Sequence, residues 1–183
     1  MSDVQSDVSR GGDTPGIAGA VAAGQSGWRA LPLVALVVAL DQWTKVLIEK
    51  HYELYESTRL LPVLDIARWH NTGAAFSFLA GAGGWQRWFF TLLAIVVSVV
   101  MVLWMRRIVH REERWLTFGL AAIVGGALGN AIDRLQHGYV VDFIVAHWGN
   151  AYFPAFNVAD SSITLGAALL LVDAFFTRHR SSP

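Results

Sequence analysis

Three carboxylates lie in a stretch of the chain that is otherwise apolar enough to enter a membrane. Asp133, Asp142 and Asp160 fall within residues 125–166, among glycine, alanine, valine and aromatic residues. Ionisable side chains at membrane depth are costly, so each needs a structural partner or a function. Asp133 has a basic neighbour in Arg134, whereas Asp142 and Asp160 have no cation within a helical turn in sequence. We therefore place the chemistry at Asp142 and Asp160.

Two carboxylates that share one proton can serve as a general acid and a general base. Asp142 is flanked on both sides by large apolar residues in VVDFIVAHW, and such surroundings raise the pKa of a carboxyl group. Our hypothesis is that Asp160 takes a proton from water and Asp142 donates one to the carbonyl oxygen or leaving nitrogen. Because a coupled pair titrates as a unit, the assignment describes the pair rather than either residue alone.

Structural explanations for the two aspartates stay open. Asp142 can be a hydrogen-bonded loop turn or a partner for Arg134. Asn157 can be the N-cap of a helix with Asp160 as its third residue. The Asp160 carboxylate would then accept hydrogen bonds from backbone N–H groups and interact favourably with the helix dipole. Such capping does not exclude catalysis.

Five further polar residues are candidates for substrate binding or for support of the aspartates. Asp41 and Lys45 stand four apart on one helical face, which favours an internal ion pair or a role at a neighbouring site. Asn130 and Arg134 are also four apart, and can orient a carboxylate or a substrate carbonyl or satisfy carbonyls at a helix end. Asn71 lies in an Asn-Thr-Gly turn, and serves either that turn alone or the site.

Several other chemistries lack their residues. The chain has no cysteine, which excludes disulfides, thiolate metal sites and a cysteine nucleophile. It has no H-E-x-x-H motif, no G-x-S-x-G motif and no glycine loop for nucleotide phosphates. His137 and His147 fall in a predicted loop, where we expect them to face water. The formal net charge of zero argues against nucleic acid as a partner, and we expect no metal and no cofactor.

Four hydrophobic segments must position these side chains. Of the 183 residues, 54% are hydrophobic and 15% are charged, against about 25% charged in a typical soluble domain. A helix needs about 20 residues to cross the hydrocarbon core. We predict spanning helices at residues 28–47, 85–105, 115–133 and 156–176. Gly125 and Gly129 form a G-x-x-x-G pair that lets a neighbouring helix approach the third segment closely.

Two of the segments that connect the predicted helices differ from each other in composition. Residues 50–84 contain short strand-like runs at 60–69 and 74–79 around a turn signal at Asn71-Thr72-Gly73. This pattern predicts a small antiparallel sheet lying on the membrane surface. Residues 135–155 are predicted to form a loop.

Basic residues predict the orientation of the chain. Four arginines follow the second segment and two follow the fourth, which places those loops in the cytoplasm. Both termini are then cytoplasmic, as a disordered tail at residues 1–27 and a second tail at residues 178–183. The 50–84 region and the 135–155 loop face outward, and the three aspartates gather near that outer boundary.

At these residues the chain resembles the bacterial lipoprotein signal peptidases, also called signal peptidase II. Five stretches resemble the family in the same order along the chain, from the first predicted helix into the fourth. They are DQWTK at 41–45, HNTGAAFSFL at 70–79, GGALGNAIDR at 125–134, GYVVDFI at 138–144 and FPAFNVADSSITLG at 153–166.

The resemblance implies an all-α polytopic membrane protein with four transmembrane helices and a small periplasmic antiparallel β-sheet. Residues 28–177 are then a membrane protease domain that includes the β-region at 50–84. The family's catalytic aspartates fall on Asp142 and Asp160. Its other functional polar positions fall on Asp41, Lys45, Asn71, Asn130, Arg134 and Asn157. Asp133 would be a structural carboxylate, and Gly126 and Ala159 serve packing.

The implied substrate is a diacylglyceryl-modified prolipoprotein, cleaved just before its lipidated cysteine in the inner membrane. Membrane lipid is the other expected partner, and we expect a monomer. Trp69, Phe76 and Phe78 of the predicted sheet are candidates to cradle the extended substrate. A different class of function, a membrane binder or transporter with cation-coordinating carboxylates, predicts acidic groups near the midplane rather than at one boundary.

Overall fold

The structure is a computed structural model that describes residues 27–73, 83–108 and 114–180, with side chains to residue 175 in the last range. Four helices in these ranges are long and apolar enough to cross a membrane, which confirms the prediction. They are α1 (Leu31–His51, after the short 3-10 helix η3, Gly27–Ala30), α2 (Trp85–Met105), α3 (Arg114–Gln136) and α4 (Val158–Arg180).

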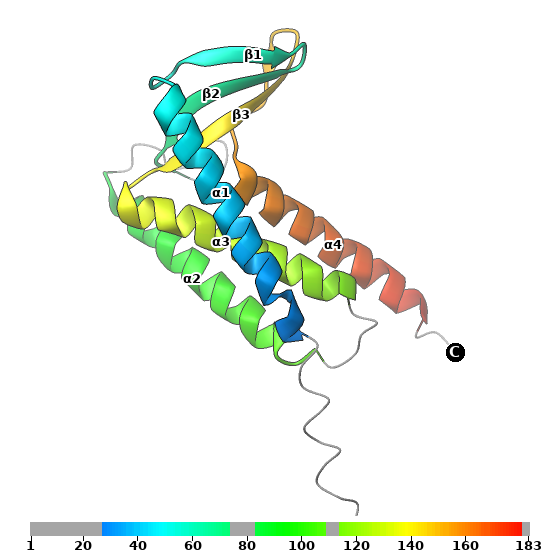
Figure 1. Cartoon of the computed structure of the whole chain (residues 1–183). Helices are drawn as coiled ribbons and strands as arrows, with labels where there is room; N and C mark the ends of the chain where they lie inside the picture. The colour runs from blue at the N-terminus through cyan, green and yellow to red at the C-terminus, as the bar shows by residue number, and fades with distance from the viewer. Residues whose placement is uncertain (1–26, 74–82, 109–113, 181–183) are drawn as a thin grey trace, which may run out of the picture.

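Helix α3 lies at the centre of the bundle and contacts the other three helices (Figure 1). Its residues 119–127 are all buried, because its neighbours cover it on every side. Helix α1 buries one stripe instead, at Val34, Val37, Asp41, Lys45 and Ile48, and exposes its other faces. The stripe follows helical spacing, so its two charged members, Asp41 and Lys45, turn toward α3.

Glycines make the close packing around α3 geometrically feasible. A Cβ at Gly125 would lie 2.7 Å from Cβ of Val37, so the G-x-x-x-G pair faces α1 as predicted for a close helix approach. Gly126 lies against the backbone carbonyl of Ala159, which agrees with the packing role expected for both residues. The contact brings the start of α4 directly onto α3.

The sheet has four antiparallel strands in the order β1-β2-β3-β4, so the predicted small antiparallel sheet is confirmed. Its strands are β1 (Ser57–Leu61), β2 (Leu64–Asn71), β3 (Val140–Trp148) and β4 (Ala151–Tyr152). The prediction of a loop at 135–155 is wrong, because β3 and β4 come from it. VVDFIVAHW is an apolar run of strand length, and its pairing with β2 could only be recognised in three dimensions.

The first predicted strand also contains a turn. Leu61 pairs with Leu64, so the chain reverses within the run 60–69 rather than only at Asn71-Thr72-Gly73. The second predicted run, at 74–79, lies outside the described residues.

A register shift in β2 lies beside the carboxylate on β3. The pairing of β2 with β3 shifts between Ile66 and Trp69, after which Trp69 lies opposite Asp142. Bulges of this kind redirect side chains and are frequent beside active sites.

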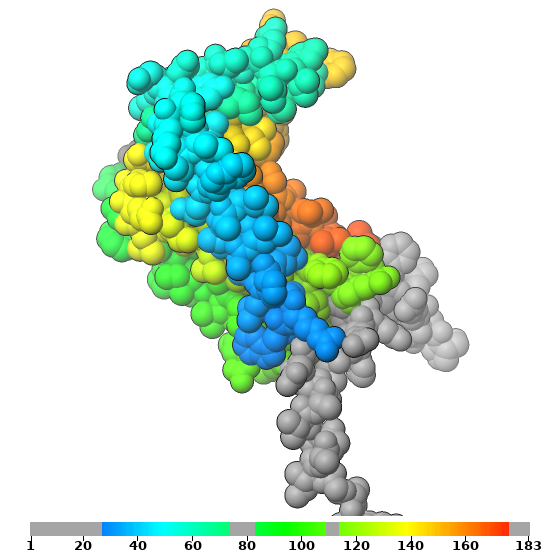
Figure 2. Space-filling model, in the orientation of Figure 1, coloured from blue at the N-terminus to red at the C-terminus, as the bar shows by residue number. Residues whose placement is uncertain are grey.

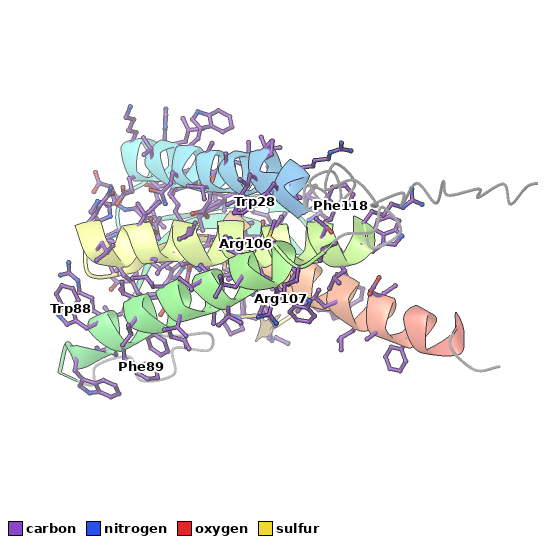
Figure 3. All side chains as sticks on the ribbon, turned by 90° about the horizontal axis from the view of Figure 1, so that it is seen from below. Trp28, Trp88, Phe89, Arg106, Arg107 and Phe118 are labelled. Atoms are coloured by element: carbon purple, nitrogen blue, oxygen red, sulfur yellow. The ribbon has the colours of Figure 1, made fainter. Side chains whose placement is uncertain are left out.

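Two ends of the helix bundle differ in composition. Figure 3 shows Trp88 and Phe89 near the start of α2, and Arg106 and Arg107 at its other end close to Trp28. The guanidinium of Arg106 lies 6.0 Å from the centre of the Trp28 ring. Arg87, near the start of α2, donates to the carbonyl of Leu135, near the end of α3, at 2.8 Å. The chain enters β3 of the sheet directly after this end of α3. The arginine end is therefore opposite the sheet.

Candidate active site

Strand β3 carries the first catalytic candidate, Asp142, whose side chain is only 2% exposed. Its Oδ2 accepts a hydrogen bond from Nδ2 of Asn71 at 2.9 Å, and its Oδ1 accepts one from Nδ2 of Asn157 at 2.7 Å. Both partners are neutral amides. Asn71 is thus more than a turn former, although its Oδ1 also accepts the Gly73 backbone N–H at 2.9 Å.

Helix α4 carries the second candidate, Asp160, in its first turn. The Asp160 backbone N–H donates to Oδ1 of Asn157 at 2.9 Å, and the Asn157 backbone N–H donates to Oδ2 of Asp160 at 3.3 Å. This reciprocal pair confirms the predicted cap. Oδ1 of Asp160 also accepts from Nδ2 of Asn130 at 2.7 Å, so the carboxylate is held from α3 as well as from its own helix.

Asn157 connects the two carboxylates. It donates to Asp142 through its side chain and bonds Asp160 through its backbone N–H and its side-chain oxygen. Its Nδ2 also lies 3.1 Å from Oδ1 of Asn130. A single buried amide at the helix start therefore sets the relative placement of the two aspartates.

A second group of charged side chains surrounds Lys45. Its Nζ is 2.7 Å from Oδ2 of Asp41, which confirms the predicted ion pair, and 2.9 Å from Oδ2 of Asp133. The third contact is to Oδ1 of Asn130 at 3.0 Å. The predicted pairing of Asp133 with Arg134 is wrong, because Asp133 turns toward α1.

Both carboxylates bound to Lys45 also accept a backbone N–H next to a catalytic candidate. Oδ1 of Asp41 accepts from the Ala159 N–H at 2.9 Å, one residue before Asp160. Oδ2 of Asp133 accepts from the Val141 N–H at 3.1 Å, one residue before Asp142. One ammonium group is thus connected to both candidates through a carboxylate and a backbone amide.

Gln42 is a member of this network that the sequence analysis missed. Its Nε2 lies 2.8 Å from Oδ1 of Asp133, 3.2 Å from the Gly129 carbonyl and 3.3 Å from Oδ2 of Asp41. A signal was present in the sequence, since Gln42 is an amide beside Asp41 in a helix that is otherwise largely apolar.

Arg134 organises the backbone around the site. It donates through Nη2 to the Gly73 carbonyl at 2.9 Å and through Nη1 to the Asn130 carbonyl at 3.3 Å. Its guanidinium carbon lies 5.3 Å from the centre of the Phe90 ring. Arg134 therefore anchors the turn that follows Asn71, and among the described residues it forms no ion pair with Asp142.

The electrostatics of Asp142 suit a carboxyl that holds a proton near neutral pH. Burial, and after it the nearby Asp160 carboxylate, raises the pKa of Asp142 to about 7, against the opposing hydrogen bonds from Asn71 and Asn157. The predicted upward shift is confirmed, and its causes are the low polarity of the site and a like charge.

Two cavities meet at Asp142. The larger, of about 820 Å³, contains both aspartates and runs along α4 past Ile163 to Ala168. The smaller, of about 490 Å³, lies on the sheet side between Trp69 and Tyr152. In Figure 2 the outline of the molecule is indented between the sheet and α4. Asp142 lines both cavities, and Asp160 lines the larger one.

The two histidines of the 135–155 region have different surroundings. His137 is exposed as expected. His147 is buried, with Nε2 3.3 Å from Oδ1 of Asp65 and its ring stacked on Tyr152, so the prediction that it faces water is wrong. Within the described residues, no group of three or more His, Asp or Glu side chains is arranged to hold a metal ion.

The chain matches a known family over most of its length. The sequence model described as Signal peptidase (SPase) II matches residues 33–176. This chain belongs to the signal peptidase II family. It is an endopeptidase of that type and a multi-pass protein of the bacterial inner membrane.

Close relatives within the signal peptidase II family are named lipoprotein signal peptidase. The relative from Pseudomonas syringae pv. tomato is 51% identical over 156 residues, 83% of this chain and 87% of its own length. The one from Shewanella halifaxensis is 50% identical over 153 residues, 83% of this chain and 89% of its own length. A solved structure described as a bacterial membrane enzyme has a TM-score of 0.74 at 29% identity, covering 85% of this chain and 92% of the other. All the candidate residues, from Asp41 to Asp160, lie inside the region that matches the signal peptidase II family.

Proposed function

We propose that this signal peptidase uses Asp142 and Asp160 as an aspartic dyad to remove signal peptides from diacylglyceryl-modified prolipoproteins. Cleavage falls just before the lipidated cysteine. The observation that supports the dyad most directly is that both carboxylates line one cavity while Asn157 bonds each of them. Relatives about half identical to this chain carry the name lipoprotein signal peptidase, which supports the substrate class.

The proposed reaction begins with protonated Asp142 and ionised Asp160. Water attacks the scissile carbonyl carbon while Asp160 takes one of its protons and Asp142 donates its own to the carbonyl oxygen. The resulting diol collapses as Asp160 returns its proton to the leaving nitrogen and Asp142 recovers a proton from a hydroxyl. The C–N bond breaks, and both carboxyl groups return to their starting states. General acid–base catalysis of this kind contributes about 10²–10⁴-fold per group.

The surroundings of each aspartate fit its part. The pKa of about 7 leaves a sizeable fraction of Asp142 protonated at neutral pH, as an acid requires. Asp160 accepts hydrogen bonds from Asn130 and from a backbone N–H at the start of α4, where the helix dipole favours negative charge. These donors support Asp160 as the base.

The depth of the proposed site fits a lipid-bearing substrate. Asp160 lies in the first turn of a candidate spanning helix, and Asp142 lies on a strand outside the spans. A diacylglyceryl group stays in the bilayer, so a peptidase that cuts beside it needs its dyad near the membrane surface. A transporter with midplane carboxylates fits this placement less well.

The proposed orientation places the dyad near the periplasmic face and both termini in the cytoplasm. Arg106 and Arg107 lie at the end of α2 that is opposite the sheet, as Figure 3 shows for the two ends of that helix. A basic end favours the cytoplasmic side. Of the aromatic residues expected to cradle substrate, Trp69 is half-exposed on β2, and Phe76 and Phe78 lie outside the described residues.

Cleavage of a diacylglyceryl precursor by the purified chain, with a metal chelator present, tests the proposal. We expect Asp142→Asn and Asp160→Asn each to lower kcat by at least about 10²–10⁴-fold, because each removes one proton-transfer group. Asp173→Asn on the same helix is the matched control and should keep the parent rate. Undiminished turnover in either amide variant would rule out the dyad.

A further inference from the structure

The two cavities that meet at Asp142 belong to different environments. The larger is lined partly by the sheet and the segment 153–156 and partly by α3 and α4, both candidate spanning helices, which contribute Asn130, Ile163 and Leu165. None of the described residues that line the smaller cavity belongs to a candidate span, and Trp69, Val145 and Tyr152 come from the sheet. The first cavity therefore extends from the sheet into the depth of the candidate spans, and the second lies outside those spans.

A continuous wall joins the cavities. Both are lined by Asn71 and Asp142 and by the segment 153–155, whereas Asp160 lines only the larger one. A polypeptide that passes through both cavities must therefore pass Asp142, and the dyad marks the boundary between its two halves.

The aromatic side chains of the smaller cavity are held in place while their faces stay open. The Trp69 ring packs edge-on against Tyr55 at 5.1 Å and is 45% exposed. The Tyr152 ring stacks on His147 at 5.0 Å and is 60% exposed. Aromatic rings held in this way provide contact area with little further loss of freedom on binding.

We infer that the smaller cavity binds the polypeptide immediately after the lipidated cysteine, on the mature side of the cleavage site. This inference rests on the proposed function. The signal segment and the diacylglyceryl group are apolar and take the cavity at membrane depth along α4. The mature chain is polar and must leave the membrane, so it takes the cavity that the sheet provides. Aromatic contact, with no Lys or Arg among the described residues of this lining, favours tolerance of many sequences.

Two substrates separate this subsite from the dyad. One diacylglyceryl precursor carries an uncharged flexible extension after the cysteine, and the other ends in an amide at the cysteine. The purified full chain should cleave the extended precursor with the higher kcat/KM. Trp69→Ala or Tyr152→Ala should lower the ratio of the two kcat/KM values about tenfold, or about 1.4 kcal/mol.

Cavity-filling variants sharpen the test and remain informative if Trp69→Ala fails to fold. Val145→Trp obstructs the smaller cavity and should also lower the ratio. Ala168→Trp obstructs the larger cavity and should lower both kcat/KM values while keeping their ratio. Trp148→Ala is the control, because Trp148 is 81% exposed and lines neither cavity.

The outcomes distinguish the two proposals. An unchanged ratio in Tyr152→Ala and Val145→Trp would overturn the subsite while leaving the dyad intact. A ratio that falls in Ala168→Trp but not in Val145→Trp would place the mature chain in the other cavity. If the parent chain cleaved neither precursor, the proposed function itself would fail.

Discussion

Two sets of carboxylates lie close together in this molecule, and their donors differ. Asp41 and Asp133 share the ammonium of Lys45 at 2.7 and 2.9 Å. Asp142 and Asp160 are held by the amides of Asn71, Asn130 and Asn157, and no described residue forms an ion pair with either. A cation neutralises buried charge, whereas an amide orients a carboxyl group and leaves its proton exchangeable. The first set is therefore suited to support and the second to proton transfer.

Asn130 joins the two sets. Its Oδ1 accepts from Lys45 and its Nδ2 donates to Asp160. The Asn130 amide therefore connects the supporting set to Asp160 in one orientation, with its oxygen toward the Lys45 ammonium and its N–H group toward the carboxylate.

The largest expected effect comes from removing the cation of the supporting set. Lys45→Met leaves two buried carboxylates without their ion-pair partner and should cost about 3–5 kcal/mol of unfolding free energy. Thermal unfolding in detergent measures this loss. Lys50→Met on the exposed side of α1 is the control, and an unchanged melting temperature for Lys45→Met would contradict the comparison.

The next effect is the pH dependence of stability that comes from Asp142. Its pKa of about 7 in the folded state exceeds that of an unfolded aspartate. The contribution of Asp142 to the free energy of unfolding is therefore fully present below about pH 4 and is lost as the pH rises to about 7. The slope approaches about 1.4 kcal/mol per pH unit within that window.

Unfolding measured across this pH range should show the slope in the parent and a smaller slope in Asp142→Asn. The same titration should make activity fall above about pH 7, as Asp142 loses the proton that it donates. Equal slopes in the two proteins would show that Asp142 does not carry the shift.

A smaller effect follows from exchanging the amide that joins the sets. Asn130→Asp removes the donor to Asp160 and places a like charge beside it, while still offering Lys45 an oxygen. We expect kcat to fall about a hundredfold, or about 2.7 kcal/mol, with little change in melting temperature. Asn150→Asp in the exposed turn before β4 is the control. A loss of stability as large as that of Lys45→Met would mean that Asn130 belongs to the supporting set alone.

The smallest expected effect concerns Gln42. Gln42→Leu removes a donor to Asp133 and should cost about 1–2 kcal/mol of stability, with a several-fold lower kcat because the Val141 N–H loses a well-held acceptor. Gln136→Leu, at the exposed end of α3, should change neither quantity. If Gln42→Leu behaved like this control, the network would not depend on its amide.

The sequence by itself determined the four spanning helices, and it offered the Asp41–Lys45 pair and the Asn157 cap as alternatives that the structure contains. Each depends on residues close in the chain, where apolar length, four-residue spacing and capping geometry act locally. The family resemblance likewise rests on short contiguous motifs, so it was visible before any fold.

Only the tertiary structure decided which partners distant residues take. The pairing of β2 with β3 turns a predicted loop into a strand and brings Asn71 to Asp142 across 71 positions of sequence. Asp133 bonds Lys45 rather than the adjacent Arg134 because the small residues of α3 bring α1 close, and side chains one apart on a helix point in different directions. Such contacts depend on the packing of whole helices, which no local spacing encodes.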